Sequence, residues 1–466
     1  MDEHLNERLK ILNNAVANKS GRYVLYWMQM FKRAESNHAL AYAIREANRL
    51  GLPLVVYEGL KYYYPWASDR IHTFILEGVN EKREAFKKLG ITYLFYLQKD
   101  ERSPKQTVAR IAKDAALLVT DEFPCFIIPE HNRRIAARAS IPVKSVDSNG
   151  IVPLSFFEKE EYAAYTIRPK IKKVLSKYLK RFEEISLENP DPEVSLDCPD
   201  TVFEDAEIPS LVAECDIDHS VPPSEIYKGG RKAGCERLAK FVNEILPNYS
   251  ESRNKPDRDG SSRLSSYLHF GFLSALEVAL AVKNSTAPDE SKDAYLEELI
   301  VRRELSYNMT GFNPNYDSLR ALPDWVQQTM RDHLGDKRDY IYSLEELEQG
   351  KTHDQLWNSI QLEMVKTGEM HNYVRMLWGK NIIAWSESYK TAFETLVHLN
   401  NKYCLDGRNP NSYAGILWCF GKHDRPWMER PVFGKIRYMT SNSTGRKFDS
   451  KAYIEWVGEL DQRSLF

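Results

Sequence analysis

Three of the nine tryptophans, Trp357, Trp378 and Trp385, lie in the segment 356–385. Trp378 and Trp385 are seven residues apart, which on a helix is about two turns and places both rings on nearly the same face. Trp357 precedes a helix break predicted at 367–368, so it belongs to a neighbouring helix. Oxidisable indoles in a row suit electron transfer to a bound cofactor. Aromatic residues at helical spacing usually pack in a core, so core packing is the default interpretation and electron transfer the alternative.

Polar residues lie among and after these tryptophans. Asn372 and Arg375 are three residues apart on the same predicted helix and share a face. Further along, Asp406 and Gly407 signal a turn, in which Asp406 could form an ion pair with Arg375. A plain turn is the default interpretation of this second segment.

A third segment is rich in groups that bind phosphate. A predicted helix is preceded by Gly260 and then by Ser261, Ser262, Arg263, Leu264 and Ser265. Hydroxyls, a guanidinium and free backbone N–H groups at a helix start can hold a diphosphate. Serine-rich helix caps are common, so simple capping is the default and a phosphate cradle is the alternative.

The predicted helix at 295–310 carries five charged residues within eight positions, namely Glu297, Glu298, Arg302, Arg303 and Glu304. Such charges usually form a solvated face with pairs four residues apart. A carboxylate that faced a cavity instead could donate a proton or hydrogen-bond an imide ring.

A local excess of positive charge occurs near the end of the chain. Residues 421–451 contain eight Lys/Arg and three Asp/Glu, interleaved with Trp427, Phe433 and Tyr438. Cations interleaved with aromatic rings are typical of a face that binds nucleic acid.

Short apolar runs alternate with amphipathic stretches in the first part of the chain. Strands are predicted at 23–28, 53–57, 91–97, 116–120 and 142–146, and helices at 34–50, 69–89, 104–113 and 129–139. This alternation predicts a doubly wound parallel sheet. No GxGxxG follows the first strand, but a ligand can still bind at the carboxyl ends of such strands.

The composition changes after this α/β pattern. Residues 182–226 contain fourteen Asp/Glu, six Pro and no Lys or Arg, which indicates an extended linker without chemistry. Beyond it, helices are predicted at 234–246, 272–283, 293–310, 354–366, 370–386 and 389–401, with no strand. We therefore predict an α/β domain at 1–181, a linker at 182–226, and an α-helical domain at 227–466 that can bury a large cofactor.

Overall composition excludes several classes of protein. The net charge of −2 provides no global basic field, so any nucleic-acid site must be local. The six cysteines form no CxxC pair and have no histidine at metal-ligand spacing, so we expect reduced thiols and no metal site. The chain starts with polar residues, unlike a signal peptide, and no apolar run reaches the roughly 18 residues of a membrane span.

Five motifs, in this order, resemble the DNA photolyase/cryptochrome family, and within it the class II cyclobutane pyrimidine dimer photolyases. They are GSSRLSSYLHFG (260–271), EELIVRREL (297–305), MHNYVRMLWGKNIIAW (370–385), LDGRNPNSYAGILWCFGKHDRPW (405–427) and FGKIRYM (433–439). The last two resemble class II in particular. The resemblance covers nearly the whole chain and implies that the helical domain binds FAD.

The resemblance implies where FAD is held. Tyr249 and the run Ser261–Ser265 match contacts to the FAD ribityl and diphosphate. Asn372, Arg375 and Asp406 match groups around the isoalloxazine ring.

It also implies a route for electrons. Asn400 resembles the class II asparagine that faces flavin N5, and the adjacent Asn401 leaves that assignment open. Trp357, Trp378 and Trp385 match the class II electron-transfer chain.

The same motifs imply which residues contact the substrate. Glu298 matches the glutamate that contacts the pyrimidine dimer, Met376 a neighbour of that dimer, and Arg253 a DNA-contacting arginine. Many relatives have a tryptophan three or four residues after this glutamate, where Val301 and Arg302 stand here. We therefore expect Trp418 to supply the wall against which the dimer packs.

The resemblance predicts a light-driven enzyme in which reduced FAD donates an electron to a pyrimidine dimer flipped out of double-stranded DNA. An antenna chromophore, a deazaflavin or a folate, could bind the α/β domain, but no motif identifies it. We expect a monomer in the cytoplasm, or in the nucleus if the source is a eukaryote.

Two alternatives remain open. One is a cryptochrome-like blue-light photoreceptor on the same flavin site, although the ten residues after Trp456 leave no room for a long signalling tail. The other is a non-catalytic nucleotide-binding module that uses the N-terminal sheet, which leaves the helical half unexplained.

Overall fold

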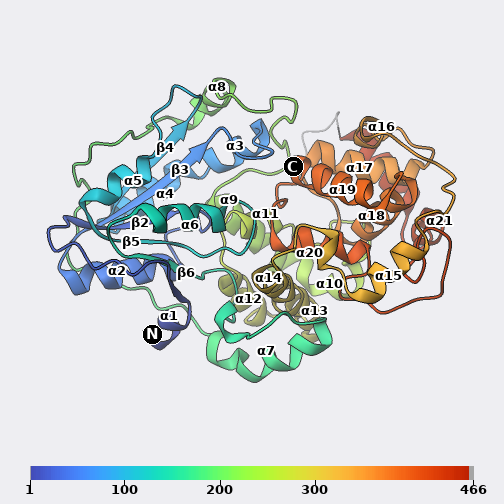
Figure 1. The fold of residues 1–466 in the computed structure, drawn as a ribbon, viewed down its shortest axis with the longest axis horizontal. Coiled ribbons are helices and arrows are strands. Elements are labelled where there is room, and N and C mark those ends of the chain that lie inside the picture. The colour runs from blue at the N-terminus through green and yellow to red at the C-terminus, as the bar shows by residue number, and fades with distance from the viewer. Residues whose placement is uncertain (1, 461–466) are drawn as a thin grey trace.

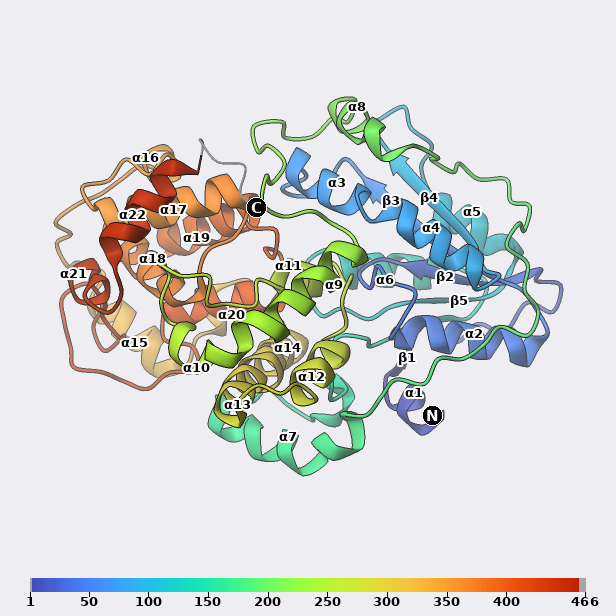
Figure 2. The same cartoon turned by 180° about the vertical axis from the view of Figure 1, so that it is seen from behind.

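The computed structural model describes residues 2–460, which form an α/β half and a helical half. Figure 1 shows the sheet and its helices in blue to green, with the C-terminal helices beside them in green to red. Figure 2 shows both halves from behind, with α9 (Arg231–Lys240) at their junction. None of the described helices is long and apolar enough to cross a membrane.

Six strands form one sheet in the order β1-β6-β5-β2-β3-β4. They are β1 (Leu9–Ile11), β2 (Tyr23–Met28), β3 (Leu54–Lys61), β4 (Thr92–Gln98), β5 (Ala115–Asp121) and β6 (Val143–Val146). The five predicted strands are confirmed, and all pairs among them are parallel. The sequence did not predict β1, which pairs antiparallel with β6 and makes the sheet mixed.

Both faces of the sheet are buried, because alternate residues of a strand point to opposite sides. In β2, Val24 and Tyr26 belong to the core that contains α2 (His38–Leu50). Leu25 and Trp27 belong to a second core on the other face, which contains Ile135 of α6 (Ile128–Arg138). Helices therefore cover both faces, as a doubly wound sheet requires.

The helix predicted at 69–89 is in fact two helices, α3 (Asp69–Leu76) and α4 (Val79–Lys88). The break falls at Gly78, where a Cβ would lie 2.5 Å from the Phe272 ring and 2.9 Å from Gly230. The helical half therefore approaches so closely that a side chain has no space here.

Other N-terminal elements also differ from the prediction. The helix predicted at 104–113 is only α5 (Thr107–Ile111), followed by the 3₁₀ turn η1 (Ala112–Asp114). Two helices were not predicted, α1 (Asp2–Glu7) and α7 (Ala164–Tyr178).

The acidic segment 182–226 follows the outer edge of the α/β half to the short helix α8 (Ile208–Ala213) (Figure 2). Its charges are partly neutralised, because Asp200 pairs with Arg83 at 2.9 Å and Glu214 with Lys99 at 2.5 Å. The Asp200 carboxylate also accepts the Phe95 N–H at 3.0 Å. The segment is thus bound along its length, and the domain boundaries at its two ends stay a prediction.

Residues 227–460 contain no strand, as predicted. The helices are α9, α10 (Tyr249–Ser252), α11 (Ser265–His269), α12 (Ala275–Lys283), α13 (Asp289–Leu296), α14 (Arg303–Phe312), α15 (Asp324–Asp332), α16 (Leu344–Glu348), α17 (Gln355–Thr367), α18 (Asn372–Trp385), α19 (Tyr389–Tyr403), α20 (Pro410–Cys419), α21 (Ser441–Gly445) and α22 (Ser450–Glu459). Two π-helical turns interrupt them, η4 (Phe241–Ile245) and η6 (Glu297–Arg302). The second divides the helix predicted at 293–310.

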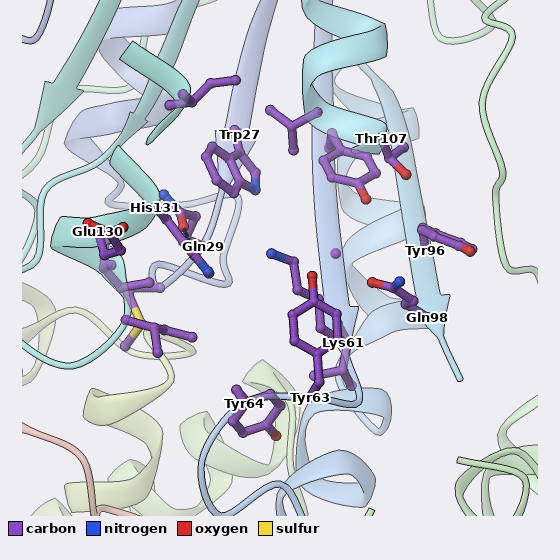
Figure 3. Close-up of a pocket in the computed structure, with 18 of the residues that line it drawn as sticks. Trp27, Gln29, Lys61, Tyr63, Tyr64, Tyr96, Gln98, Thr107, Glu130 and His131 are labelled. Atoms are coloured by element: carbon purple, nitrogen blue, oxygen red, sulfur yellow. Dashed lines mark hydrogen bonds between the residues drawn. The ribbon is translucent and has the colours of Figure 1, made fainter. Parts of the chain in front are cut away.

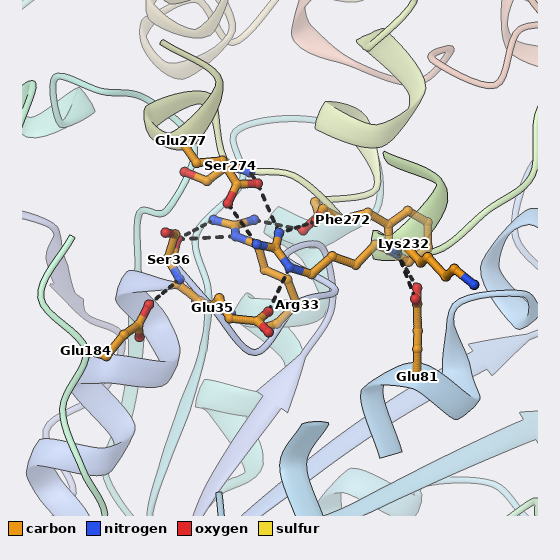
Figure 4. Close-up of polar contacts among 12 residues, drawn as sticks. Arg33, Glu35, Ser36, Glu81, Glu184, Lys232, Phe272, Ser274 and Glu277 are labelled. Atoms are coloured by element: carbon orange, nitrogen blue, oxygen red, sulfur yellow. Dashed lines mark hydrogen bonds and ion pairs between the residues drawn. The ribbon is translucent and has the colours of Figure 1, made fainter. Parts of the chain in front are cut away.

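Two arginines join the halves at the start of α9 (Figure 4). The buried Arg33 of the α/β half donates to the carbonyl of Gly271 at 2.9 Å. Arg231 of the helical half pairs with Glu277 at 3.0 Å and with Glu35 of the α/β half at 2.9 Å. Charges and carbonyls from both halves therefore satisfy one another across the junction.

A second ionic cluster lies inside the α/β half. The fully buried Glu58 on β3 pairs with Lys32 at 2.8 Å and Lys82 at 2.5 Å, and accepts the Tyr93 hydroxyl at 2.7 Å. Burial by itself would raise the pKa of Glu58, but the two ammonium groups outweigh it and lower that pKa to about 2. The cluster thereby ties α4 and the edge strand β4 to β3.

We expect Glu58→Gln to lower the free energy of unfolding by about 3–5 kcal/mol, because it leaves two buried lysines without a charged partner. Urea denaturation followed by circular dichroism measures this loss. Glu130→Gln is the control, since Glu130 pairs with Arg133 and Arg134 on the surface and should contribute little. Equal losses in the two variants would contradict a structural role for the buried cluster.

Candidate functional site

The three tryptophans of the segment 356–385 come together in the core of the helical half. Trp357, Trp378 and Trp385 are 0%, 1% and 7% exposed. The Trp357 and Trp385 rings lie 5.4 Å apart, and the Trp357 indole N–H donates to the carbonyl of Trp378 at 3.0 Å. The neighbour of Trp385 is thus Trp357 from α17. The prediction from spacing paired Trp385 with Trp378, and it missed this contact because it depends on how two helices pack.

Two rings outside the predicted set of residues extend this row to the surface. Tyr342 and His353 lie 5.6 and 5.1 Å from the Trp385 ring, and the Tyr342 hydroxyl is 2.6 Å from His353 Nδ1. His353 is exposed. No local signal distinguishes these residues, since both lie in irregular segments, Tyr342 before α16 and His353 before α17.

A polar centre lies one helical turn from Trp378 on α18. The ion pair that was the alternative to a plain turn is present, with Arg375 Nη2 3.6 Å from Asp406 Oδ2. Arg375 Nη1 also donates to Asn400 Oδ1 at 3.2 Å. Asn372, the first residue of α18, is exposed. Arg375 therefore contacts two other residues that were predicted to surround a flavin ring, Asp406 and Asn400.

The two neighbouring asparagines play different parts. Asn401 is fully buried, and its side-chain oxygen accepts the Arg408 N–H at 2.8 Å. Asn400 instead directs its oxygen at Arg375. The geometry favours Asn400 as the asparagine of the polar centre, because the Asn401 oxygen already holds the turn after α19.

Several buried polar atoms around Arg375 have no hydrogen-bond partner among the described residues. They are Asp406 Oδ1, Glu369 Oε2 and His371 Nε2. Burial, with the charge of Asp406, raises the pKa of Glu369 to about 8 against the opposing charge of Arg375. Burial also lowers the pKa of His371 to about 4, with help from the positive charges of Arg263 and Arg375. Buried polar atoms normally have partners, so this arrangement fits a ligand with several donors and acceptors, such as FAD.

The segment 260–265 gathers cations around one carboxylate. Asp259 accepts Arg263 Nε at 2.9 Å and lies 3.3 Å from Arg237. The described part of the chain offers no acceptor to the backbone N–H groups of Ser261 and Ser262. Tyr249 is buried and packs edge-on against Tyr295. Two arginines and free N–H groups are compatible with a diphosphate, the alternative to simple capping for this loop.

The charged helix at 295–310 is not the solvated face expected from its pattern. Arg303 and Glu304 are only 7% and 3% exposed. Arg303 donates to the carbonyl of Asn149 at 2.8 Å, while Glu304 Oε1 accepts the N–H groups of Ile151 and Val152 at 2.8 and 3.1 Å. Partners more than a hundred residues away satisfy these charges, and local periodicity cannot reveal them.

The residues predicted to meet the substrate lie on neighbouring elements. Glu298 on η6 pairs with Arg253 at 3.3 Å, and both side chains are about one-third exposed. Trp418 on α20 is half-buried, so it is not a core tryptophan. Met376 on α18 reaches the same helix, because its sulfur lies 3.8 Å from that of Cys419.

The basic segment 421–451 exposes cations paired with aromatic rings. Arg425 and Arg437 lie 5.3 and 5.0 Å from the centre of the Trp427 ring, which is 39% exposed. Arg430 lies 5.4 Å from the Tyr438 ring. Phe433, in contrast, is buried. The face therefore presents flat aromatic surface and positive charge together.

A cavity of about 740 Å³ lies at the carboxyl ends of β2, β3 and β4, where an α/β sheet usually binds ligands (Figure 3). Trp27, Gln29, Lys61 and Gln98 line it from these strand ends. Arg408 of the helical half lines it as well, so the cavity borders the turn that carries Asp406.

Comparison with known proteins gives consistent matches. A sequence profile described as DNA photolyase matches residues 24–191. A deoxyribodipyrimidine photo-lyase from Methanothermobacter thermautotrophicus is 40% identical, with 98% of this chain and 99% of that protein covered. A deoxyribodipyrimidine photo-lyase from Arabidopsis thaliana is also 40% identical, over 94% of this chain and 89% of its own length.

More distant matches show the fold and one alternative. Cryptochrome-1 of Arabidopsis thaliana is 23% identical over 95% of this chain and 64% of its own length. The crystal structure of a class III photolyase from Agrobacterium tumefaciens superimposes with a TM-score of 0.69 at 16% identity, covering 94% of this chain and 86% of that one. The α/β half followed by a helical half is therefore a known architecture.

Glu304 should make stability depend on pH. Burial raises its pKa to about 7, although the N–H groups of Val152 and Ile151 oppose the shift. Between the unfolded pKa of about 4.3 and pH 7 the folded state binds the extra proton, so stability should fall as the pH rises through this window. Glu304→Gln should flatten that fall. Urea denaturation at a series of pH values measures it, and parallel curves for the parent and the variant would contradict the assignment.

Proposed function

The chain belongs to the DNA photolyase family, and we propose that it uses light to repair cyclobutane pyrimidine dimers in double-stranded DNA. Bound FAD in its reduced form would supply the electron that opens the cyclobutane ring. The observation that carries the proposal is the row of buried indoles, which starts one helical turn from Arg375 and leads to the surface at His353. Such a row connects a buried redox site to an external electron donor.

The chain's own residues would hold FAD at both ends. Arg375 already contacts both Asp406 and Asn400, and the three residues would face the flavin ring, with Asn400 at N5. Arg263 and the free N–H groups of Ser261 and Ser262 would bind the diphosphate. Supporting this division, the pairing of Asp406 with Arg375 leaves one carboxylate oxygen free to accept a ligand donor.

The tryptophans would pass electrons inward in the order Trp385, Trp357, Trp378. Direct contacts support this order, since Trp357 touches the Trp385 ring and donates to the Trp378 carbonyl. The Trp378 indole N–H donates to Gln361 Oε1 at 2.8 Å, which fixes the orientation of the innermost ring.

The dimer would lie beside Glu298, Met376 and Trp418. In its protonated form, the carboxyl group of Glu298 would donate a hydrogen bond to a pyrimidine carbonyl as negative charge builds on that carbonyl. Arg253 and the basic face at 421–451 would contact phosphates, which a chain with a net charge of −2 must do locally.

We also propose that the cavity at the strand ends holds a light-harvesting chromophore. Aromatic walls, among them Trp27 and Tyr96, would stack on a planar ring system. Its position beside Arg408, two residues after Asp406, would bring that chromophore close to the flavin site. A mass spectrum of the molecules released from native protein would distinguish a deazaflavin, a folate or none.

Class II membership within the family is also our proposal, supported by the motifs at 405–427 and 433–439. We further propose that the protein acts as a monomer, in the cytoplasm or in a eukaryotic nucleus. A cryptochrome-like photoreceptor is the second candidate, and the difference between 23% and 40% identity favours repair.

The test is repair of a dimer-containing oligonucleotide by the purified protein. Dimers should disappear under blue or near-UV light and persist in the dark. A flavin-loaded, chemically reduced protein that leaves the dimers intact in light would contradict the proposal and favour a photoreceptor.

We expect Trp378→Phe to slow the light-driven reduction of bound oxidised flavin by at least tenfold, because it removes the innermost donor while largely keeping the shape of the core. Absorption spectroscopy under continuous illumination measures the rate. Trp456→Phe is the matched control, since Trp456 is half-buried on α22 outside the row. After chemical reduction both variants should repair at the parent rate. Similar photoreduction in both would leave the row with a packing role only.

A further inference from the structure

Arg302 lies at the surface beside the residues assigned to substrate binding. Its guanidinium carbon is 5.4 Å from the centre of the Trp418 ring, and its side chain is 35% exposed. Trp418 is itself half-buried. A guanidinium over an indole is a favourable cation–π contact, so the two groups form a continuous, partly exposed surface.

The helix geometry places Arg302 next to Glu298. Both belong to the π-helical turn η6, in which hydrogen bonds run from a residue to the fifth one along. Residues four apart therefore lie on nearly the same side of the turn. Glu298 is 38% exposed and pairs with Arg253. Carboxylate, guanidinium and indole thus border one region of the surface.

Among the described residues, the Arg302 guanidinium pairs with Glu297 and donates no hydrogen bond to it. Arg302 Nε is 3.6 Å from Glu297 Oε1, beyond hydrogen-bond length. Glu297 is already held by Arg168 through three hydrogen bonds of 3.3, 3.0 and 2.6 Å. No described residue accepts a hydrogen bond from the Arg302 side chain. Its N–H groups therefore remain available to a ligand.

We propose that Arg302 is a substrate-binding residue whose guanidinium, stacked beside Trp418, forms with that indole a mixed wall for the extruded pyrimidine dimer. The inference rests on the proposed function. A planar, weakly hydrated guanidinium can pack against a pyrimidine ring and donate to its carbonyl, which a lysine ammonium cannot do in the same way. The Arg302–Trp418 wall would therefore recognise the dimer and ignore undamaged, stacked bases.

The experiment compares binding to two duplexes of one sequence, with and without a thymine dimer, in the dark at fixed salt. Arg302→Met should weaken binding of the dimer duplex roughly tenfold and of the undamaged duplex less than twofold. Arg168→Met is the matched control, because it removes a cation from the same Glu297 away from Trp418. It should change the preference for the dimer by less than about twofold. Both variants should keep the flavin absorption spectrum of the parent.

Two further variants separate shape from charge. Arg302→Lys keeps the positive charge but removes the planar guanidinium group. Like Arg302→Met, it should therefore lose the preference for binding the dimer duplex. Arg302→Trp keeps a flat surface, so it should stay within about threefold of the parent.

Three results would overturn the inference. One is that Arg302→Met loses affinity equally for both duplexes, with a slope of log K against log salt that is flatter by about one unit. That result would mark a phosphate contact. The others are an unchanged preference in Arg302→Met and a full preference in Arg302→Lys. Light-driven repair by the parent protein is measured alongside. A parent that repairs while its variants give any of these three results contradicts this inference alone, whereas a parent without repair contradicts the proposed function.

Discussion

The buried guanidinium of Arg70 holds the ends of two helices on which the candidate site depends. Arg70 on α3 is 1% exposed and donates to the carbonyls of Val365 at 2.7 Å and Tyr403 at 2.9 Å. These carbonyls belong to the last turns of α17 and α19, where the unpaired carbonyls of a helix and its dipole both favour a cation. Burying an arginine is costly unless its donors are used, so the guanidinium fixes both helix ends relative to the sheet. Glu369 follows one of these ends and Asp406 the other, so the polar centre around Arg375 takes its geometry from a residue of the α/β half.

Much of the fold follows from short-range patterns. Parallel strands buried on both faces appear as continuous apolar runs, so 23–28 and the four other predicted strands were found, although β3 extends four residues beyond its predicted end. Strand β1 has no such apolar run. It is a short, largely exposed edge strand that pairs with β6, so no local pattern predicts it. The break at Gly78 depends on Phe272, nearly two hundred residues away. Helix α7 contains Pro169, a residue that ordinarily indicates the end of a helix.

The candidate site could be predicted as a set of residues more readily than as a geometry. The pairing of Asp406 with Arg375 followed from a turn and an opposite charge, and the structure has it. The contact of Trp357 with Trp385 could not follow from spacing, because the rings come from different helices. Arg303 and Glu304 were expected on a solvated face, and their burial depends on backbone groups near Asn149 and Ile151. Local sequence reports which groups are present, while distant packing decides which of them face one another.

Core packing and electron transfer were opposed interpretations of the tryptophan row, yet the structure makes the first a condition of the second. The rings of Trp357 and Trp378 are at most 1% exposed, and each indole N–H is bound, one to a backbone carbonyl and one to Gln361. Close packing fixes ring positions and excludes water, so rings held in this way keep constant separations. A row of rings that transfers electrons must also end where an external electron donor can reach it. Trp385 provides that end, because its neighbours Tyr342 and His353 continue the ring contacts to the exposed surface. The same side chains can thus stabilise the helical half and, in the proposed role, connect the flavin site to solvent.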